Sequence, residues 1–268
     1  MIRNFGVLAA FIYLSGCASV PQTSGVQLVS DKPLETVTDE QGRNVSRYVD
    51  AARLSAIKSY VLPEINLTLP VENPDISKEQ LALISNALNR SICTRLGQYL
   101  TADPDASGNA MRVEVSLTGI TPTSKSIAGL SAAMDTFVPG PFRIPVGMGA
   151  IALDARASND EGTLAFMRWA KGANPVTNSA KVSTIGDAYA LIETFTREFG
   201  QLLMQGAGGP EKRQKLPDAQ INVNEGICES RFGKVDPVGK GASFLIPLSP
   251  EFIDKGKPET VKDSEDGN

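Results

Sequence analysis

Apolar residues recur at three- or four-residue steps in two stretches of the chain, and this spacing predicts two amphipathic helices. In the first, Ser77 and Gln80 have the spacing of a capping box, so we expect a helix over about 77–100. Its apolar positions are Leu81, Ile84, Leu88, Ile92 and Leu96. The second opens at Thr184 and should stop at Gly206. Its apolar positions are Ile185, Tyr189, Ile192, Phe195, Phe199 and Leu202.

Alternating apolar and polar residues predict strands between and before these helices. The stretch MRVEVSLTGI at 111–120 reads as a half-buried strand, and residues 150–172 read as a hairpin with its turn at 159–162. The stretch IKSYVLPEINLTL at 57–69 predicts a strand bent at Pro63. Strand, helix, strand, insert, hairpin and helix in this order predict an α+β fold, a two-layer domain with amphipathic helices on one face of a mostly antiparallel sheet.

The N-terminus has the features of a bacterial lipoprotein signal peptide. Arg3 precedes an apolar run that is too short to span a bilayer, and the run ends in the lipobox Leu14-Ser15-Gly16-Cys17. We expect residues 1–16 to be removed and Cys17 to be lipidated, which would anchor the chain in the membrane. Ala18 in place of an aspartate favours the outer membrane and its periplasmic face. The alternative is an ordinary secretory signal with a chance cysteine.

The rest of the chain divides into three segments by composition and pattern. Residues 17–50 are polar and turn-rich, which predicts a lipidated N-terminus and tether. Residues 51–206 form the predicted α+β domain. Residues 207–268 are interpreted as a C-terminal extension that ends in a disordered acidic tail.

Composition limits the chemistry. The net charge of −4 gives no basic footprint for nucleic acid, so we expect no nucleic-acid partner. Histidine is absent, which excludes Ser-His-Asp and Cys-His catalysis and histidine metal sites. With Cys17 lipidated, Cys93 and Cys228 remain as one candidate disulfide in an oxidising compartment. Two buried, reduced thiols are the alternative.

Three patterns resemble catalytic motifs, and each has a simpler interpretation. Ser55 and Lys58 spell S-x-x-K, but the S-D-N and K-T-G elements that accompany this motif in penicillin-recognising enzymes are missing. Residues 147–152 match G-x-G-x-x-A, yet they lead into a strand, which favours a glycine-rich turn over a dinucleotide site. Four charged strand residues are interpreted as ion pairs on a solvated sheet face rather than as a catalytic carboxylate pair: Arg112, Glu114, Asp154 and Arg156. We expect no cofactor, no metal and no enzymatic activity.

The insert at 126–149 is the least ordinary stretch. Asp135 and Arg143 are its charged residues, and it is rich in proline, glycine and large apolar side chains. A long loop of this kind is usually functional, and its apolar residues need a surface to pack on. We identify a candidate interaction surface for an envelope protein partner: Phe137, Val138, Phe142, Ile144 and Val146. Packing of the insert on its own domain, which we favour for the glycine-rich end near Gly147, and disorder are the alternatives.

The stretches SYVLPEINLTL, MRVEVSLTGI and RIPVG, with the helices and linked strands around them, resemble the DUF3313 family over roughly residues 24–204. The resemblance implies a bacterial envelope lipoprotein of unknown function and supplies no catalytic residues. We therefore expect a non-enzymatic binding or scaffolding module. The alternatives are a structural subunit of an envelope secretion or pore assembly and an enzyme with an unrecognised acid or Ser-Lys site.

Overall fold

The structure is a computed structural model that describes residues 28–38, 44–65, 67, 75–103, 109–124, 148–173, 183–206, 209–235 and 249–254. Its elements follow one another in this order: β1 (Glu35–Thr38), β2 (Asn44–Val49), α1 (Ala51–Ala56), β3 (Ser59–Tyr60), α2 (Lys78–Gly97), β4 (Thr101–Ala102), β5 (Arg112–Thr121), β6 (Ala150–Asn159), β7 (Gly162–Gly172), α4 (Gly186–Leu203), β8 (Gln205–Gly206), β9 (Gly209–Lys212), α5 (Asp218–Phe232) and α7 (Pro250–Ile253).

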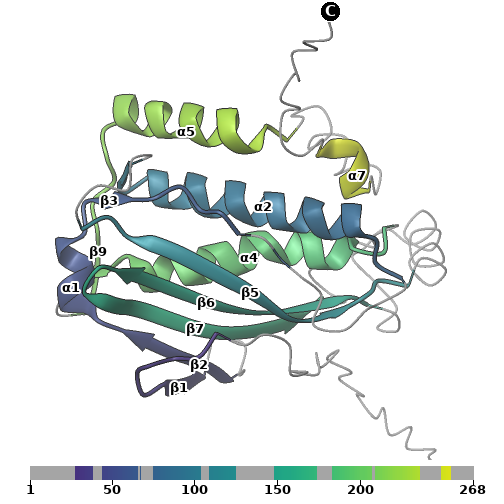
Figure 1. Ribbon diagram of the computed structural model, residues 1–268, viewed down its shortest axis with the longest axis horizontal. Helices are drawn as coiled ribbons and strands as arrows, with labels where there is room; N and C mark the ends of the chain where they lie inside the picture. Colours follow the sequence, from purple (N-terminus) through teal and green to yellow (C-terminus); the bar gives the residue numbers. More distant parts are fainter. Residues whose placement is uncertain are drawn as a thin grey trace, which may run out of the picture.

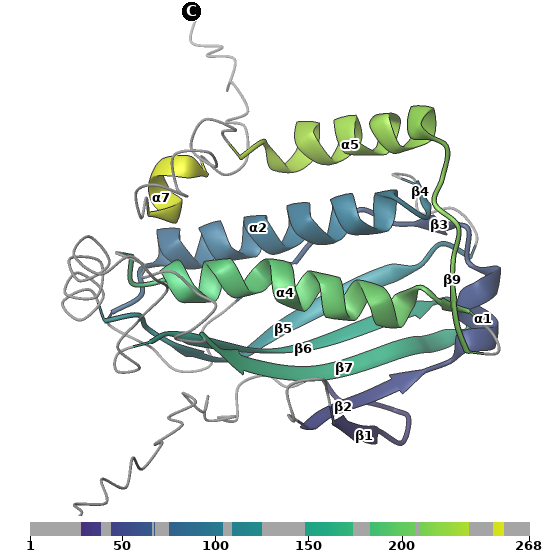
Figure 2. The same ribbon diagram turned by 180° about the vertical axis from the view of Figure 1, so that it is seen from behind.

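Five strands form one antiparallel sheet in the order β1-β2-β7-β6-β5. Helices α2 and α4 lie side by side on one face of this sheet, as Figures 1 and 2 show from opposite sides. Helix α5 lies on α2, farther from the sheet, and makes a third layer over part of the molecule (Figure 1). The predicted α+β class is confirmed.

The main core lies between the helices and the sheet. Trp169 of β7 meets Phe195 of α4 edge to face with ring centroids 5.4 Å apart, and Phe195 stacks on Phe199 at 5.8 Å. All three side chains are buried, and the indole N–H of Trp169 donates to the Glu198 carboxylate at 2.6 Å. Aromatic side chains bury large areas and add specific pair geometry, so this cluster fixes α4 on the sheet.

Helix α2 begins as the sequence predicts. The Ser77 hydroxyl accepts from the Gln80 backbone N–H at 3.2 Å, and the Gln80 side chain accepts from the Ser77 N–H at 3.1 Å, which completes the capping box. Helix α4 begins at Gly186 without a side-chain cap and ends at Leu203. The prediction that it stops at Gly206 was therefore too long, because Gly206 belongs to strand β8.

Part of the predicted tether belongs to the sheet. Residues 35–38 and 44–49 are strands β1 and β2, and β2 pairs with β7, with Tyr48 opposite Phe166. On β2, Val45 and Val49 pack against the core, while Ser46 and Tyr48 alternate with them and lie on the other face of the sheet. The boundary at residue 50 was therefore wrong, because the pairing that makes these residues a strand comes from β7, more than a hundred residues later.

The predicted bent strand over 57–69 is also corrected, since among the described residues of this stretch, 57–65 and 67, only Ser59–Tyr60 form a strand. Beyond it the chain is held by side chains of α2 instead of by a neighbouring strand. Asn89 accepts from the Ile65 N–H at 2.8 Å and donates to the Ile65 carbonyl at 2.9 Å. The Ser85 hydroxyl accepts from the Leu67 N–H at 3.3 Å. Ile65 and Leu67 are buried, so the apolar pattern was correct about burial and wrong about pairing.

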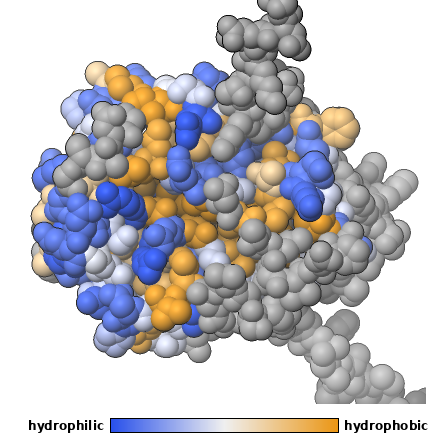
Figure 3. All heavy atoms as spheres, viewed as in Figure 1, coloured by the Kyte–Doolittle hydropathy of each residue, from blue (hydrophilic) through white to orange (hydrophobic). Residues whose placement is uncertain are grey.

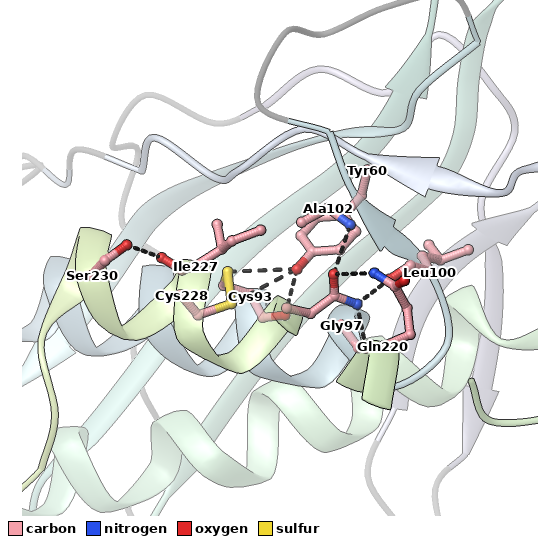
Figure 4. Close-up of a disulfide and its surroundings, with 10 residues drawn as sticks. Tyr60, Cys93, Gly97, Leu100, Ala102, Gln220, Ile227, Cys228 and Ser230 are labelled. Atoms are coloured by element: carbon pink, nitrogen blue, oxygen red, sulfur yellow. Dashed lines mark hydrogen bonds between the residues drawn. A yellow bond between two sulfur atoms is a disulfide. The ribbon is translucent and has the colours of Figure 1, made fainter. Parts of the chain in front are cut away.

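Part of the predicted C-terminal extension is built into the fold. Helix α5 packs on α2, and Cys228 forms a disulfide with Cys93, with the Cα atoms 5.8 Å apart (Figure 4). This is the pairing that the cysteine count allowed. Burial raises the pKa of the nearby Tyr60 phenol, which therefore keeps its proton and donates to the Cys93 carbonyl at 3.0 Å.

A buried amide holds the other half of α5. Asn224 is 1% exposed, and its side-chain nitrogen donates to the carbonyls of Gly97 at 2.7 Å and Leu100 at 2.9 Å (Figure 4). Its oxygen accepts from the Ala102 N–H at 3.1 Å. Asn224 therefore satisfies backbone groups at the end of α2 that would otherwise be buried without partners.

Apolar residues also reach the surface. Figure 3 shows them gathered in the middle of the face seen in Figure 1, with polar and charged residues around them. Three large apolar side chains of the described residues are clearly exposed: Val29, Val223 and Phe252. Single apolar residues at a surface are normal, so none of these positions alone indicates a binding site.

We expect the disulfide to carry much of the stability of the α5 layer. Replacing Cys93 and Cys228 with alanine should lower the free energy of unfolding by about 2–5 kcal/mol, because the cross-link closes a long loop in the unfolded chain. Urea unfolding followed by the fluorescence of Trp169, the single tryptophan, measures the effect. The variant should not respond to a reducing agent. An unfolding midpoint of the unmodified protein that is equal with and without reductant would contradict the prediction.

Candidate interaction site

The chain just before the predicted insert and the last residues of the insert meet at one end of the sheet, where β5 ends and β6 begins. We call this region the loop end and define it by residues 121–124, 148–150, 172–173 and 183–187. Strand β7 also ends here and α4 also begins here, on the right in Figure 1. The sheet and α4 thus bring four chain segments together.

Asp187 is the central residue of the loop end. It is 1% exposed, and one of its carboxylate oxygens accepts from the Thr123 hydroxyl at 3.0 Å and from the Gly149 N–H at 2.7 Å. As the second residue of α4, it also lies where the helix dipole favours negative charge. One buried carboxylate therefore fixes the residues on both sides of 125–147.

Backbone hydrogen bonds reinforce this anchor. The Thr123 N–H donates to the Thr184 carbonyl at 2.7 Å, and the Ala173 N–H donates to the Gly149 carbonyl at 2.9 Å. The Asp187 N–H donates back to the Thr123 hydroxyl at 3.3 Å. The end of β5, the start of β6, the end of β7 and the start of α4 are thereby tied to one another.

Gly149 is required by close packing at this point. A Cβ atom there would lie 2.6 Å from the Thr123 hydroxyl oxygen and 3.0 Å from the Thr121 carbonyl oxygen. Strand β6 follows at once from Ala150, so the glycines lead into a strand and open no helix. As the sequence predicts, this motif runs into a strand, whereas a dinucleotide site needs a helix N-terminus for the phosphates.

Six of the predicted site residues lie outside the described residues. They are Cys17 and the five apolar residues of the insert: Phe137, Val138, Phe142, Ile144 and Val146. The structure describes the chain up to Ser124, just before the insert, and the last two residues of the insert, Met148 and Gly149, and what was expected of the residues between them stays a prediction.

The other motif candidates take structural roles. The Ser55 hydroxyl donates to the Ala52 carbonyl of its own helix at 2.7 Å, and the Ser55 and Lys58 side chains are exposed. Glu114 and Arg156 lie opposite each other on β5 and β6 and form an ion pair, as the sequence predicts. Arg112 pairs with Asp160 at 2.7 Å.

Asp154 departs from the expected solvated ion pairs, because it is fully buried. Both of its oxygens accept from Arg168 on the neighbouring strand, at 3.1 and 3.2 Å. The Arg168 guanidinium compensates the burial of this carboxylate, and removing it would leave the carboxylate buried without its partner. The strand pattern placed Asp154 on the correct face but could not show that this part of the face is covered.

Neither a metal centre nor a membrane-spanning helix is present among the described residues. No group of three or more His, Cys, Asp or Glu side chains in this part of the chain is arranged to hold a metal ion. None of the described helices is long and apolar enough to cross a membrane.

Residues 26–199 match the family model DUF3313, described as a protein of unknown function. The chain belongs to the DUF3313 family. Two PelC dodecamer structures from Paraburkholderia phytofirmans are similar to it at 9% and 11% sequence identity, with TM-scores of 0.34 and 0.31. They cover 59% and 56% of this chain and 97% and 93% of the PelC chains. None of the curated proteins compared with the chain matches it.

The DUF3313 match contains the whole loop end and stops at residue 199, inside α4. Beyond it, the short helix α7 returns to the starts of α2 and α4 (Figure 2). The Glu251 carboxylate accepts from the Gln80 side chain and from the Ser183 hydroxyl, both at 2.9 Å. The C-terminal segment thus reaches the loop end at Ser183.

A second contact of this segment lies along the same two helices. Asp254 is 2% exposed, pairs with Arg90 and accepts from the Tyr189 hydroxyl at 2.5 Å. Burial and the Asp254 carboxylate raise the pKa of the Tyr189 phenol, which therefore remains a hydrogen-bond donor. Sequence reasoning missed this cluster, because Arg90 and Asp254 are 164 positions apart and neither belongs to a recognisable motif.

The anchor can be tested at Asp187. Replacing Asp187 with alanine leaves the Gly149 N–H and the Thr123 hydroxyl buried without their acceptor, so we expect a loss of roughly 2–5 kcal/mol in the free energy of unfolding. Trypsin should also cut faster after Lys125 and Arg143, since the insert would lose its fixed ends. Glu193→Ala, at an exposed position of the same helix, is the matched control. Equal stability and equal cleavage of the two variants would refute the anchor.

The Glu251 contact should weaken in acid. Burial alone would raise the pKa of this carboxyl, but hydrogen bonds from Gln80, Ser183 and neighbouring groups outweigh it, and the pKa lies below its ordinary value of 4.5. The contact therefore stabilises docking of α7 at neutral pH and is lost as the pH falls below 4.5 through the folded-state pKa. Hydrogen exchange of residues 250–254 at several pH values should show faster exchange in acid. In Glu251→Gln the remaining acid dependence should be smaller than in the unmodified chain.

Proposed function

We propose that this DUF3313 protein is a non-enzymatic binding or scaffolding module that is anchored by lipid at Cys17 to the periplasmic face of the outer membrane. Its insert, residues 126–149, would contact an envelope protein partner. The observation that carries the proposal is the anchoring of both insert ends on α4 by the single buried carboxylate of Asp187.

The anchor supports binding because it lowers the entropic cost of presenting the insert. A loop whose ends are fixed on a rigid helix and sheet has fewer conformations to lose when it contacts a partner. Binding residues are commonly carried by loops on such scaffolds. The sheet and α4 supply the scaffold here, since Phe195 and Phe199 hold α4 on β7.

The composition of the insert supports an apolar contact. Phe137, Val138, Phe142, Ile144 and Val146 would each gain from removal from water, at about 25 cal/mol per Å² of apolar surface. Neighbouring prolines and glycines limit regular structure in the insert, so its apolar side chains have no predicted helix or strand stripe in which to be buried. A partner surface would supply the missing burial.

The start of the described chain is compatible with an anchor at Cys17. Asp31 accepts from the Thr163 hydroxyl at 2.6 Å, which fastens the segment just before β1 to the start of β7. Residues 17–27 precede the described chain, and an extended segment of this length spans at most about 40 Å. Under the proposal, the domain would stay within that distance of the membrane surface.

The lipid anchor is tested by Cys17→Ser in bacterial cells. The variant should lose labelling by a fatty-acid analogue and should no longer fractionate with membranes, because the thiol that carries the acyl chains is gone. Cys93→Ser, which keeps the lipobox, is the control and should remain labelled. Labelling that persists in Cys17→Ser would show that the lipid is elsewhere or that the assignment is wrong.

The partner contact is tested by photo-crosslinking from Val138 in intact cells. Discrete adducts with another envelope protein are expected, and the double variant Phe142→Ser, Ile144→Ser should lose them while its melting temperature stays within about 2 °C of the unmodified protein. Val223→Ser, an exposed apolar position on α5, should keep the adducts. A double variant that melts well below the unmodified protein would instead show that the insert packs on its own domain, and ladders of self-adducts would favour a homo-oligomeric assembly.

A further inference from the structure

Four polar side chains of α2, α4 and the turn before α4 form a surface that receives carboxylates. We call it the carboxylate receptor and define it as Gln80, Arg90, Ser183 and Tyr189. In this structure it is filled by two residues of the C-terminal segment, Glu251 and Asp254. The receptor is complete on the domain, and only the two carboxylates come from the segment.

The two halves of the carboxylate receptor bind their carboxylates through different donors. Gln80 and Ser183 both donate to one oxygen of Glu251 at 2.9 Å. Arg90 donates to both oxygens of Asp254, at 3.1 Å for Oδ1, and Tyr189 donates to Oδ2 at 2.5 Å. A ligand therefore needs two carboxylates three residues apart, the first for neutral donors and the second for a guanidinium that binds it through two nitrogens.

Polar contacts dominate the attachment of the C-terminal segment. Phe252 is 78% exposed, Ile253 is half-buried, and Pro250 is the buried apolar residue of α7. The backbone adds an isolated bridge between Asp254 and Val235. The segment has no counterpart to the disulfide that fixes α5, so its attachment can be exchanged without breaking a covalent bond.

The receptor and its occupant differ in one further respect. All four receptor residues lie within residues 26–199, the part of the chain that matches the family, whereas Glu251 and Asp254 lie beyond it. The domain thus carries the receptor, and this chain adds the segment that occupies it.

We propose that the carboxylate receptor is a docking site for an acidic peptide segment of a partner protein, with two carboxylates three residues apart, and that residues 249–254 are its resident, displaceable occupant. Tethering gives the resident segment an effective concentration of about a millimolar, so a partner must either bind more tightly or be held nearby itself. The resident segment therefore sets the minimum affinity or local concentration that a partner segment needs in order to dock.

The test uses a fluorescent peptide of residues 246–257 and the full-length chain carrying Glu251→Gln and Asp254→Asn, which frees the receptor. The freed chain should bind the peptide at least tenfold more tightly than the unmodified chain does, because its own segment no longer competes. A peptide with the same two substitutions should bind the freed chain at least tenfold more weakly. Equal binding of both peptides, or no binding to the freed chain, would overturn the proposal.

Two variants of the freed chain identify the receptor itself. Arg90→Met should weaken peptide binding at least tenfold, whereas Lys78→Met, which removes an exposed charge from the same helix, should leave it unchanged. If the freed chain does not fold, as judged by circular dichroism, hydrogen exchange of residues 250–254 in the unmodified chain replaces it. Excess unlabelled peptide should then speed this exchange at least tenfold, and unchanged exchange would overturn the proposal.

Discussion

The structure depends first on the burial of two helices against one face of an antiparallel sheet. Trp169, Phe195 and Phe199 form the largest part of this contact on the α4 side, and Leu88 and Ile92 of α2 are buried with them in the same core. Because this contact fixes α4 relative to β5 and β6, it also places Asp187 within hydrogen-bond distance of both ends of the insert. The candidate interaction site is thus a consequence of core packing, even though its proposed contact residues lie in a loop.

Polar side chains then determine where the irregular segments run. Asn89 and Ser85 hold the chain after β3 along α2, Asn224 caps the end of α2, and Asp187 holds the insert. Each of these side chains is buried and bonds to backbone atoms of another segment, and Asp187 bonds also to the Thr123 hydroxyl, which makes the contacts specific as well as favourable. The same logic explains Asp154, whose burial is tolerated because Arg168 on the adjacent strand binds both of its oxygens.

The elements that sequence reasoning predicted correctly are those whose evidence is local. A few neighbouring residues determine each of these features: the capping box at Ser77 and Gln80, the alternation in β5 and the turn between β6 and β7. Strands β1 and β2 were missed because β2 is held by pairing with the distant β7 and β1 by pairing with β2, and their own sequence is polar enough to suggest a tether. At the site, the position of the insert was predictable from its composition, but the anchor at Asp187 was not, since the pattern shows an acidic residue at the start of a helix and nothing of its partners.

Helix α5, which lies beyond the family match, was not predicted, because its buried positions do not form an apolar stripe. It buries Asn224, Cys228 and Phe232 at four-residue spacing, and because two of these are not large apolar residues, no amphipathic stripe appears in the sequence. The helix it packs on, α2, likewise buries Ser85, Asn86 and Asn89, polar residues that the spacing of apolar positions does not mark as buried. These polar residues of α2 contact backbone, such as the Phe232 carbonyl that accepts from Asn86 at 2.9 Å. Helix α2 is therefore an interior helix with an apolar face for the sheet and buried polar side chains that hold Ile65 and Leu67 before it and the end of α5 after it, which allows segments with little apolar surface to attach at defined positions.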